Sequence, residues 1–239
     1  MARRGTLNKA ELKEREKRPI RWRKYPHLFL IVCEDGNTEP YYFRTFEKHI
    51  PEETIFLRTV GTGRSSKGVV EQAIVERVKL AEEANKSVDE VWVVFDKDDA
   101  EKVPANKLRF TDAFKIAQEE KMRVAYSNEV FELWLLLHLA GISSAKSIPR
   151  ADIYLDFGKA IQSFESYKLY EYNHKKSNPK DVIGAVFLLG SEAKAIERAE
   201  KLLAEQKGKR PIDTNPSTTV HILVKRLREL IDWYSYSLD

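Results

Sequence analysis

The chain has 239 residues, of which 42% are hydrophobic and 33% are charged, and it contains only 10 glycines and 9 prolines. This composition is ordinary for a folded globular protein and excludes a fibrous or a disordered chain. The length allows one large domain, or a core of about 100 to 150 residues with a smaller appendage.

Cysteine content and hydropathy bear on the cellular compartment. The single cysteine, Cys33, excludes an internal disulfide. No apolar run has the length of a membrane span or follows the layout of a signal peptide. We therefore expect a cytoplasmic protein that has no membrane contact.

Positive charge is concentrated near the N-terminus. The net charge of +4 favours a polyanionic partner only mildly, but residues 3–24 hold ten Lys or Arg against three Glu. We interpret residues 1–26 as a basic arm. Such an arm either binds nucleic-acid backbone or is a solvated tail.

Residues 27–127 follow a repeated strand-then-helix order. Apolar runs bounded by polar or glycine-containing turns predict strands at 28–33, 55–60, 91–95 and 123–126. Helices are expected from about Pro40, from the end of the GTGRSSKG loop through about Lys86, and over 108–120. This order predicts an α/β fold in which helices flank both faces of a largely parallel sheet.

Residues 128–239 are predicted to form a helical region packed on that core, without a further strand. Helices are expected at 128–140, 152–165, 182–207 and 217–234, and the polar segment 171–181 is expected to be a loop. The last helix has the clearest apolar stripe, and Asn215 and Pro216 provide a cap-like entry.

Acidic residues follow the two most apolar strands. Glu34 comes directly after the first strand, and Asp96 and Asp98 follow the third. The carboxyl ends of parallel strands form the ligand crevice of such sheets. Carboxylates gathered there repel one another unless a cation neutralises them, and oxygen ligands suit Mg²⁺ or Mn²⁺. Taken alone, each acidic turn is more often solvated or a helix cap.

Two further acids lie at the start of the helical region. Glu129 and Glu132 are three residues apart, so on one helix they would share a face and could contribute to a second metal or an acid/base step. Alternatively, Glu129 is only a favourable charge in a first helical turn. Glu132 is the stronger candidate because its neighbours are apolar. His138 is interpreted as a packed core histidine.

Candidate nucleic-acid-binding residues lie in two polar segments. The segment GTGRSSKG contains Arg64 and Lys67, but it lacks the Gly-Lys-Ser/Thr order of a nucleotide-binding P-loop. It could hold backbone phosphate or be a plain connection. Lys175 and Lys176 are similarly placed in the later loop, where surface lysine pairs are also common.

The segments IVCEDGNTEPYYF, VVFDKDD and SNEVFELWLLLH together resemble the RloB-like family, a Toprim-related group of prokaryotic proteins linked to restriction and phage-defence loci. The family pattern places its glutamate at Glu34 and its Asp-x-Asp at Asp96 and Asp98. It also has a turn like Thr38-Glu39-Pro40, an acidic helix start like Glu129 and Glu132, and a closing motif like Asn215–Thr218. The resemblance implies a Toprim-like core.

One residue departs from the Toprim pattern. Asp35 stands where many such sites have glycine after the glutamate, and it is either an extra ligand or a charge at a helix N-terminus.

The leading hypothesis is a Mg²⁺-dependent nuclease that hydrolyses phosphodiester bonds of DNA or RNA in phage defence. An alternative is a non-catalytic nucleic-acid-binding subunit of a defence complex, and a third is nucleotidyl transfer of the primase kind. Nucleic acid, a defence-system partner protein and an oligomeric state are the expected associations.

Overall fold

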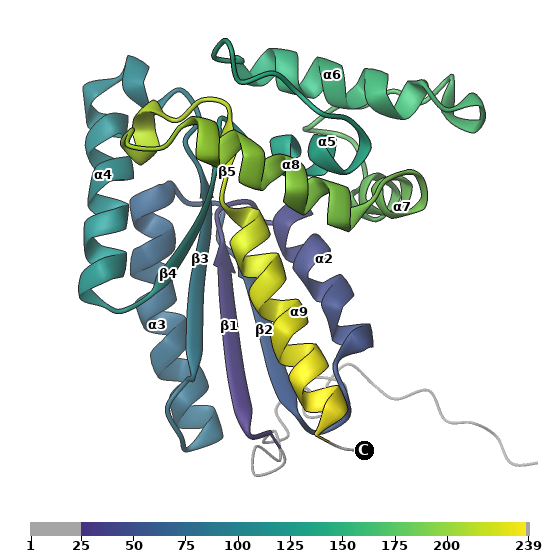
Figure 1. Ribbon diagram of the computed structural model, residues 1–239. Helices are drawn as coiled ribbons and strands as arrows, with labels where there is room; N and C mark the ends of the chain where they lie inside the picture. Colours follow the sequence, from purple (N-terminus) through teal and green to yellow (C-terminus); the bar gives the residue numbers. More distant parts are fainter. Residues whose placement is uncertain (1–24, 238–239) are drawn as a thin grey trace, which may run out of the picture.

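The computed structural model describes residues 25–237, so most of the basic arm lies outside the described residues. A five-stranded sheet with the order β2-β1-β3-β4-β5 forms its centre (Figure 1). The strands are β1 (His27–Cys33), β2 (Ile55–Gly61), β3 (Glu90–Asp96), β4 (Arg123–Asn128) and β5 (Ser217–Thr218). The first four are parallel and β5 is antiparallel to β4. The expected α/β class is therefore confirmed.

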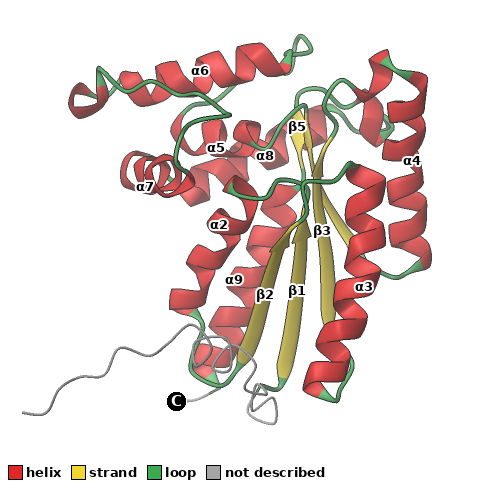
Figure 2. Ribbon diagram, turned by 180° about the vertical axis from the view of Figure 1, so that it is seen from behind, coloured by secondary structure: helices red, strands yellow, loops and turns green. Residues whose placement is uncertain are grey.

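Helices cover both faces of the sheet, which explains why β1 and β3 are almost continuously apolar. Helices α3 (Ser66–Ala84) and α4 (Pro104–Glu119) pack on one face against Leu30 and Val93. Helices α2 (Thr38–Arg44) and α9 (Val220–Tyr236) pack on the other face against Ile31 and Trp92 (Figures 1 and 2).

The remaining α-helices lie toward the carboxyl ends of the parallel strands (Figure 1). They are α5 (Glu132–Leu139), α6 (Arg150–Gln162), α7 (Pro179–Leu189) and α8 (Glu192–Glu205). Short 3-10 helices occur at η2 (Thr45–His49), η3 (Ala100–Lys102), η4 (Glu165–Tyr167) and η5 (Pro211–Asp213). One buried cluster contains Trp134 of α5, Phe157 of α6, Val186 of α7 and Phe29 of β1. Among residues 25–237 no helix is long and apolar enough to cross a membrane.

Three expectations for the helical region are wrong. The predicted helix 182–207 is divided at Gly190, where an added Cβ would lie 2.8 Å from the Cβ of His138; Ser191 then caps α8 by accepting a hydrogen bond from the Lys194 amide at 3.3 Å. A fifth strand exists at 217–218, too short for an alternating pattern to reveal, so the last helix begins only at Val220.

The third error concerns α5, which begins at Glu132 rather than at residue 128. Asn128 still pairs with Ser217 as the last residue of β4. Glu129 therefore precedes the helix, and the expectation that it shares a helical face with Glu132 is wrong.

The connections create a crevice at the carboxyl ends of β1 and β3. The chain leaves β1 for α2 on one face of the sheet and leaves β3 for α4 on the opposite face. Adjacent strands whose connections diverge in this way leave an open space between them, which is where doubly wound sheets bind ligands.

Candidate functional site

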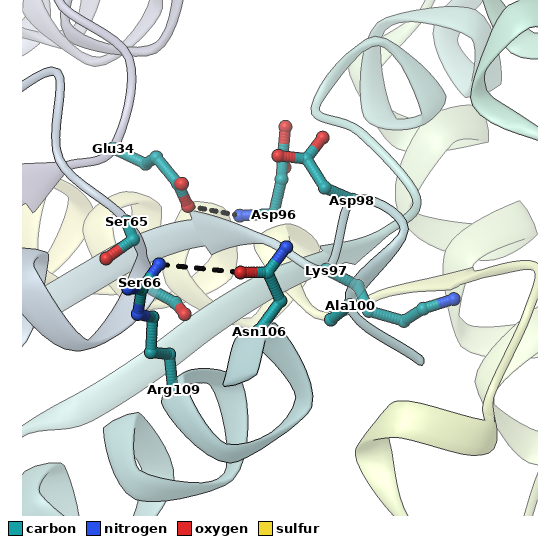
Figure 3. A pocket seen from close by; sticks show the side chains of 9 residues that line it. All are labelled: Glu34, Ser65, Ser66, Asp96, Lys97, Asp98, Ala100, Asn106 and Arg109. Atoms are coloured by element: carbon teal, nitrogen blue, oxygen red, sulfur yellow. Dashed lines mark hydrogen bonds between the residues drawn. The ribbon is translucent and has the colours of Figure 1, made fainter. Parts of the chain in front are cut away.

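A small pocket opens in this crevice, with a volume of about 100 Å³. At about 30 Å³ per water molecule it has room for a few waters or a hydrated ion. Its walls come from the ends of β1 and β3, the start of α3, the turn after β3 and α4 (Figure 3). The lining residues are Glu34, Ser65, Ser66, Asp96, Lys97, Asp98, Ala100, Asn106 and Arg109.

Glu34 is fixed by the backbone on both sides. Its amide donates to the carbonyl of Val94 at 2.9 Å, and its carbonyl accepts from the amide of Gly63 at 2.8 Å. Oε2 of its carboxyl group accepts a hydrogen bond from the Asp96 amide at 3.0 Å. Burial nevertheless raises the pKa of Glu34 to about 8. The first and third strands therefore bring Glu34 beside Asp96, as the sequence pattern predicts.

Asp96 has one satisfied and one unsatisfied oxygen. Oδ2 accepts from the amide of Phe131 at 3.0 Å. Oδ1 is buried and has no hydrogen-bond partner among residues 25–237. Burial first, and then the charges of neighbouring acids, raise the pKa of Asp96 well above its usual value. An orphaned carboxylate oxygen is costly unless a cation or proton occupies it.

Asp98 lies in the turn after β3, with a left-handed backbone at φ 48°. Its amide donates to the carbonyl of Glu129 at 3.0 Å, which ties this turn to the end of β4. The carboxylate pairs with Arg150 of α6 at 3.1 Å, and Arg150 also reaches Asp99 at 3.5 Å. The pKa of Asp98 is still raised, because burial outweighs the guanidinium.

Two more acids complete the group. Glu39 is 1% exposed and accepts a hydrogen bond from the Asp35 amide at 3.1 Å. Glu132 is also buried and accepts from the Tyr172 hydroxyl. Burial is the first cause that raises the pKa of each. In the sequence Glu39 stands out only as part of a turn motif, and the signal for its role is an acid in the first turn of an aromatic-rich helix.

The neighbouring acid Asp35 stabilises the start of α2. Its Oδ2 accepts from the Thr38 amide at 2.5 Å. This contact agrees with the interpretation of Asp35 as a charge at a helix N-terminus rather than a ligand.

Glu129 does not join the acidic group. It forms a buried ion pair with Lys97 and accepts a hydrogen bond from Asn215 Nδ2 at 2.6 Å. The side chains of Lys97 and Glu129 are each 3% exposed, so the negative charge is already compensated inside the protein. The expectation that Glu129 is a metal ligand is therefore not supported by its contacts.

The remaining acids have the donor chemistry for a hard divalent cation, and we call them the carboxylate cluster: Glu34, Glu39, Asp96, Asp98 and Glu132. Among residues 25–237, however, no group of three or more His, Cys, Asp or Glu side chains is arranged to hold a metal ion. Several of the carboxylate oxygens accept hydrogen bonds from amides, the Arg150 guanidinium or the Tyr172 hydroxyl. The orphaned Asp96 Oδ1 is the atom that fits a cation best.

Basic side chains lie in or next to the segments that line the pocket. Arg64 is exposed in the loop before α3, and Lys67 pairs with Asp112 of α4 at 3.4 Å. Arg109, which the sequence analysis did not single out, lines the pocket and donates to Asn106 Oδ1 at 3.4 Å (Figure 3).

The second loop brings further cations near the site. Lys175 and Lys176 are exposed and follow His174, whose pKa is lowered by burial and then by the charges of Lys175 and Arg150. His138, by contrast, is buried and bonded through Nδ1 to the Trp134 carbonyl at 3.0 Å. It is the packed histidine expected from the sequence.

Comparison with known proteins identifies one family. The sequence model of the RloB-like protein family matches residues 29–227, which covers most of the chain and every residue of the carboxylate cluster. Neither the curated proteins nor the solved structures contain a match. The chain therefore belongs to the RloB-like protein family.

Proposed function

We propose that this protein is a Mg²⁺- or Mn²⁺-dependent nuclease of the Toprim type, which hydrolyses phosphodiester bonds in DNA or RNA. The observation that carries the proposal is the buried, unpartnered Oδ1 of Asp96 within a group of acids whose pKa values are raised by burial and mutual repulsion. A bound divalent cation offsets such repulsion.

The acids of the carboxylate cluster have two roles in this proposal. Glu34, Asp96 and Asp98 would hold the ion. Glu39 and Glu132 would not contact it and would add negative charge next to these ligands. When bound, such an ion would supply an activated water and would stabilise the charge that develops on the phosphate. Arg109, which lines the pocket, and exposed Arg64, which directly precedes its lining residue Ser65, would hold the phosphate backbone.

The first prediction concerns Asp96→Asn. The amide side chain keeps an acceptor for the Phe131 amide but removes a negative charge, so cleavage should fall by about 100-fold or more. The measurement is a cleavage panel of plasmid, single-stranded DNA, transfer RNA and messenger RNA with Mg²⁺, Mn²⁺ or chelator. Asp213→Asn, an exposed acid paired with Arg210, is the matched control.

The melting temperature of metal-free Asp96→Asn should equal or exceed that of the wild type, because the amide cannot ionise in a buried site that disfavours the carboxylate charge. Undiminished cleavage by a folded Asp96→Asn protein would refute the proposal.

The contacts of Asp98 and Glu132 favour a second candidate, a non-catalytic nucleic-acid-binding subunit of a phage-defence complex in the cytoplasm. Ligand oxygens that are held permanently by Arg150 and Tyr172 would suit such a role. It predicts salt-sensitive binding without turnover on any nucleic acid of the panel, and no incorporation of labelled nucleoside triphosphates.

A further inference from the structure

Two aromatic rings stack beside the carboxylate cluster. Tyr154 of α6 and His174 of the loop before α7 have ring centroids 4.4 Å apart and planes inclined by only 5°. Because the rings are stacked, the phenol ring covers one face of the imidazole. Tyr154 is half-buried, whereas His174 is exposed. We call this pair the aromatic platform.

The loop that carries His174 is held in a defined turn. The amide of Asn173 donates to Ser177 Oγ at 2.9 Å, and the Ser177 amide donates to the Asn173 carbonyl at 2.7 Å. One residue before this turn, Tyr172 packs its ring edge-on against Phe157 of α6, with centroids 4.8 Å apart. The platform is therefore built into the fold from two elements.

The platform adjoins the proposed reaction site. Tyr172 reaches Glu132 with its hydroxyl, and Arg150, one helical turn before Tyr154, pairs with Asp98. The pKa of Tyr154 is raised by burial and then by the charges of Glu132 and other acids of the cluster. In Figure 1 helix α6 lies beyond the carboxyl ends of the strands and to one side of them, above α5 and α7.

Positive charge accompanies the aromatic rings. Lys175 and Lys176 follow His174 directly and are exposed, and Arg150 lies near enough to lower the pKa of His174. Cations interleaved with flat rings are the combination that binds a single strand, because the cations hold phosphates while the rings stack on bases of any identity. A duplex cannot use such a platform, since its bases are already stacked on one another.

We propose that the Tyr154–His174 aromatic platform binds a base of single-stranded nucleic acid and thereby positions the neighbouring phosphate at the carboxylate cluster. This inference rests on the proposed nuclease function and names its substrate class. A single strand, or an unpaired loop of a folded RNA, is then preferred over a duplex.

The test measures binding separately from cleavage. Fluorescence anisotropy with short labelled oligonucleotides is recorded in chelator, with single-stranded DNA, single-stranded RNA and the DNA duplex of the same sequence. His174→Ala should weaken binding of single strands by roughly 5- to 100-fold and leave duplex binding unchanged. His174→Trp should retain single-strand binding, because the flat ring is kept. His49→Ala, another exposed histidine, is the matched control.

The outcomes separate the two proposals. Three outcomes would each overturn the platform. His174→Ala could bind single strands as tightly as the wild type, or it could lose the same affinity for single strands and duplex. The third outcome is that the wild type does not bind single strands. The DNA and RNA arms show which strand the platform prefers. If single-strand binding depends on the His174 ring but the protein cleaves no nucleic acid of the Mg²⁺ panel, the platform is supported and the nuclease function is refuted.

Discussion

The carboxylate of Asp98 has two possible cationic partners, the guanidinium of Arg150 and the proposed divalent ion. Arg150 and Asp98 are 46% and 49% exposed, so their ion pair at 3.1 Å is weakened by solvent. The guanidinium is bonded to Oδ1 of Asp98, and an ion at this carboxylate would compete with it for the negative charge.

Arg150→Gln should therefore raise the affinity for Mn²⁺ or Mg²⁺ by about 2- to 5-fold, which is the worth of an exposed ion pair. Isothermal titration calorimetry without nucleic acid measures this, and Arg210→Gln, which breaks the exposed pair with Asp213, is the control. Weaker metal binding in Arg150→Gln would show that the guanidinium does not compete for Asp98.

At the scale of elements, a buried ion pair joins the turn after β3 to the end of β4. Lys97 and Glu129 are both almost fully buried, and the Lys97 amide also donates to the Ser127 carbonyl at 2.9 Å. Asn215, which precedes β5, donates to the same glutamate at 2.6 Å. Three elements are thus linked next to Asp96 and Asp98, which fixes the direction of the turn that carries the aspartates.

Lys97→Met should destabilise the fold by about 3–5 kcal/mol, because it removes the Lys97 ammonium that pairs with the buried Glu129 carboxylate. Urea unfolding followed by circular dichroism measures the loss. The double variant Lys97→Met with Glu129→Gln should recover most of it, since the glutamine is neutral and still accepts from Asn215. A double variant no more stable than the single one would contradict this account.

At the scale of the whole molecule, the raised pKa values link folding to pH. Glu34, with a pKa of about 8, keeps its proton in the folded state at pH values where an unfolded glutamate, near 4.3, has lost it. The folded state therefore binds more protons across this window. The stabilisation is complete below about pH 4.3 and is lost as pH rises through about 8.

Without divalent metal, the melting temperature should fall by several degrees between pH 5 and pH 8, at about 2–4 °C per kcal/mol for a protein of this size. Differential scanning calorimetry measures the slope, which Glu34→Gln should flatten. Mg²⁺ should raise the melting temperature more at pH 8 than at pH 5, because protons compete with the ion. A slope identical in Glu34→Gln would exclude Glu34 as a source of this dependence.

Local pattern was enough to predict the central strands and the acids that follow them. The runs LFLIVC and VWVVF are buried on both faces, and the parallel register that pairs Cys33 with Val94 brings Glu34 beside Asp96. Apolar runs bounded by polar turns determine strands, and strand ends of a parallel sheet meet at one edge.

Only the tertiary structure decided which acids stay together and what holds them. Glu129 leaves the group because Lys97 and Asn215, the latter 86 residues away, compensate it. Glu39 joins because α2 turns its first residues into the core, and Arg150 meets Asp98 across 52 residues. The same holds for the break at Gly190, which depends on His138 of another helix. Such contacts depend on packing between distant segments, which no local periodicity encodes.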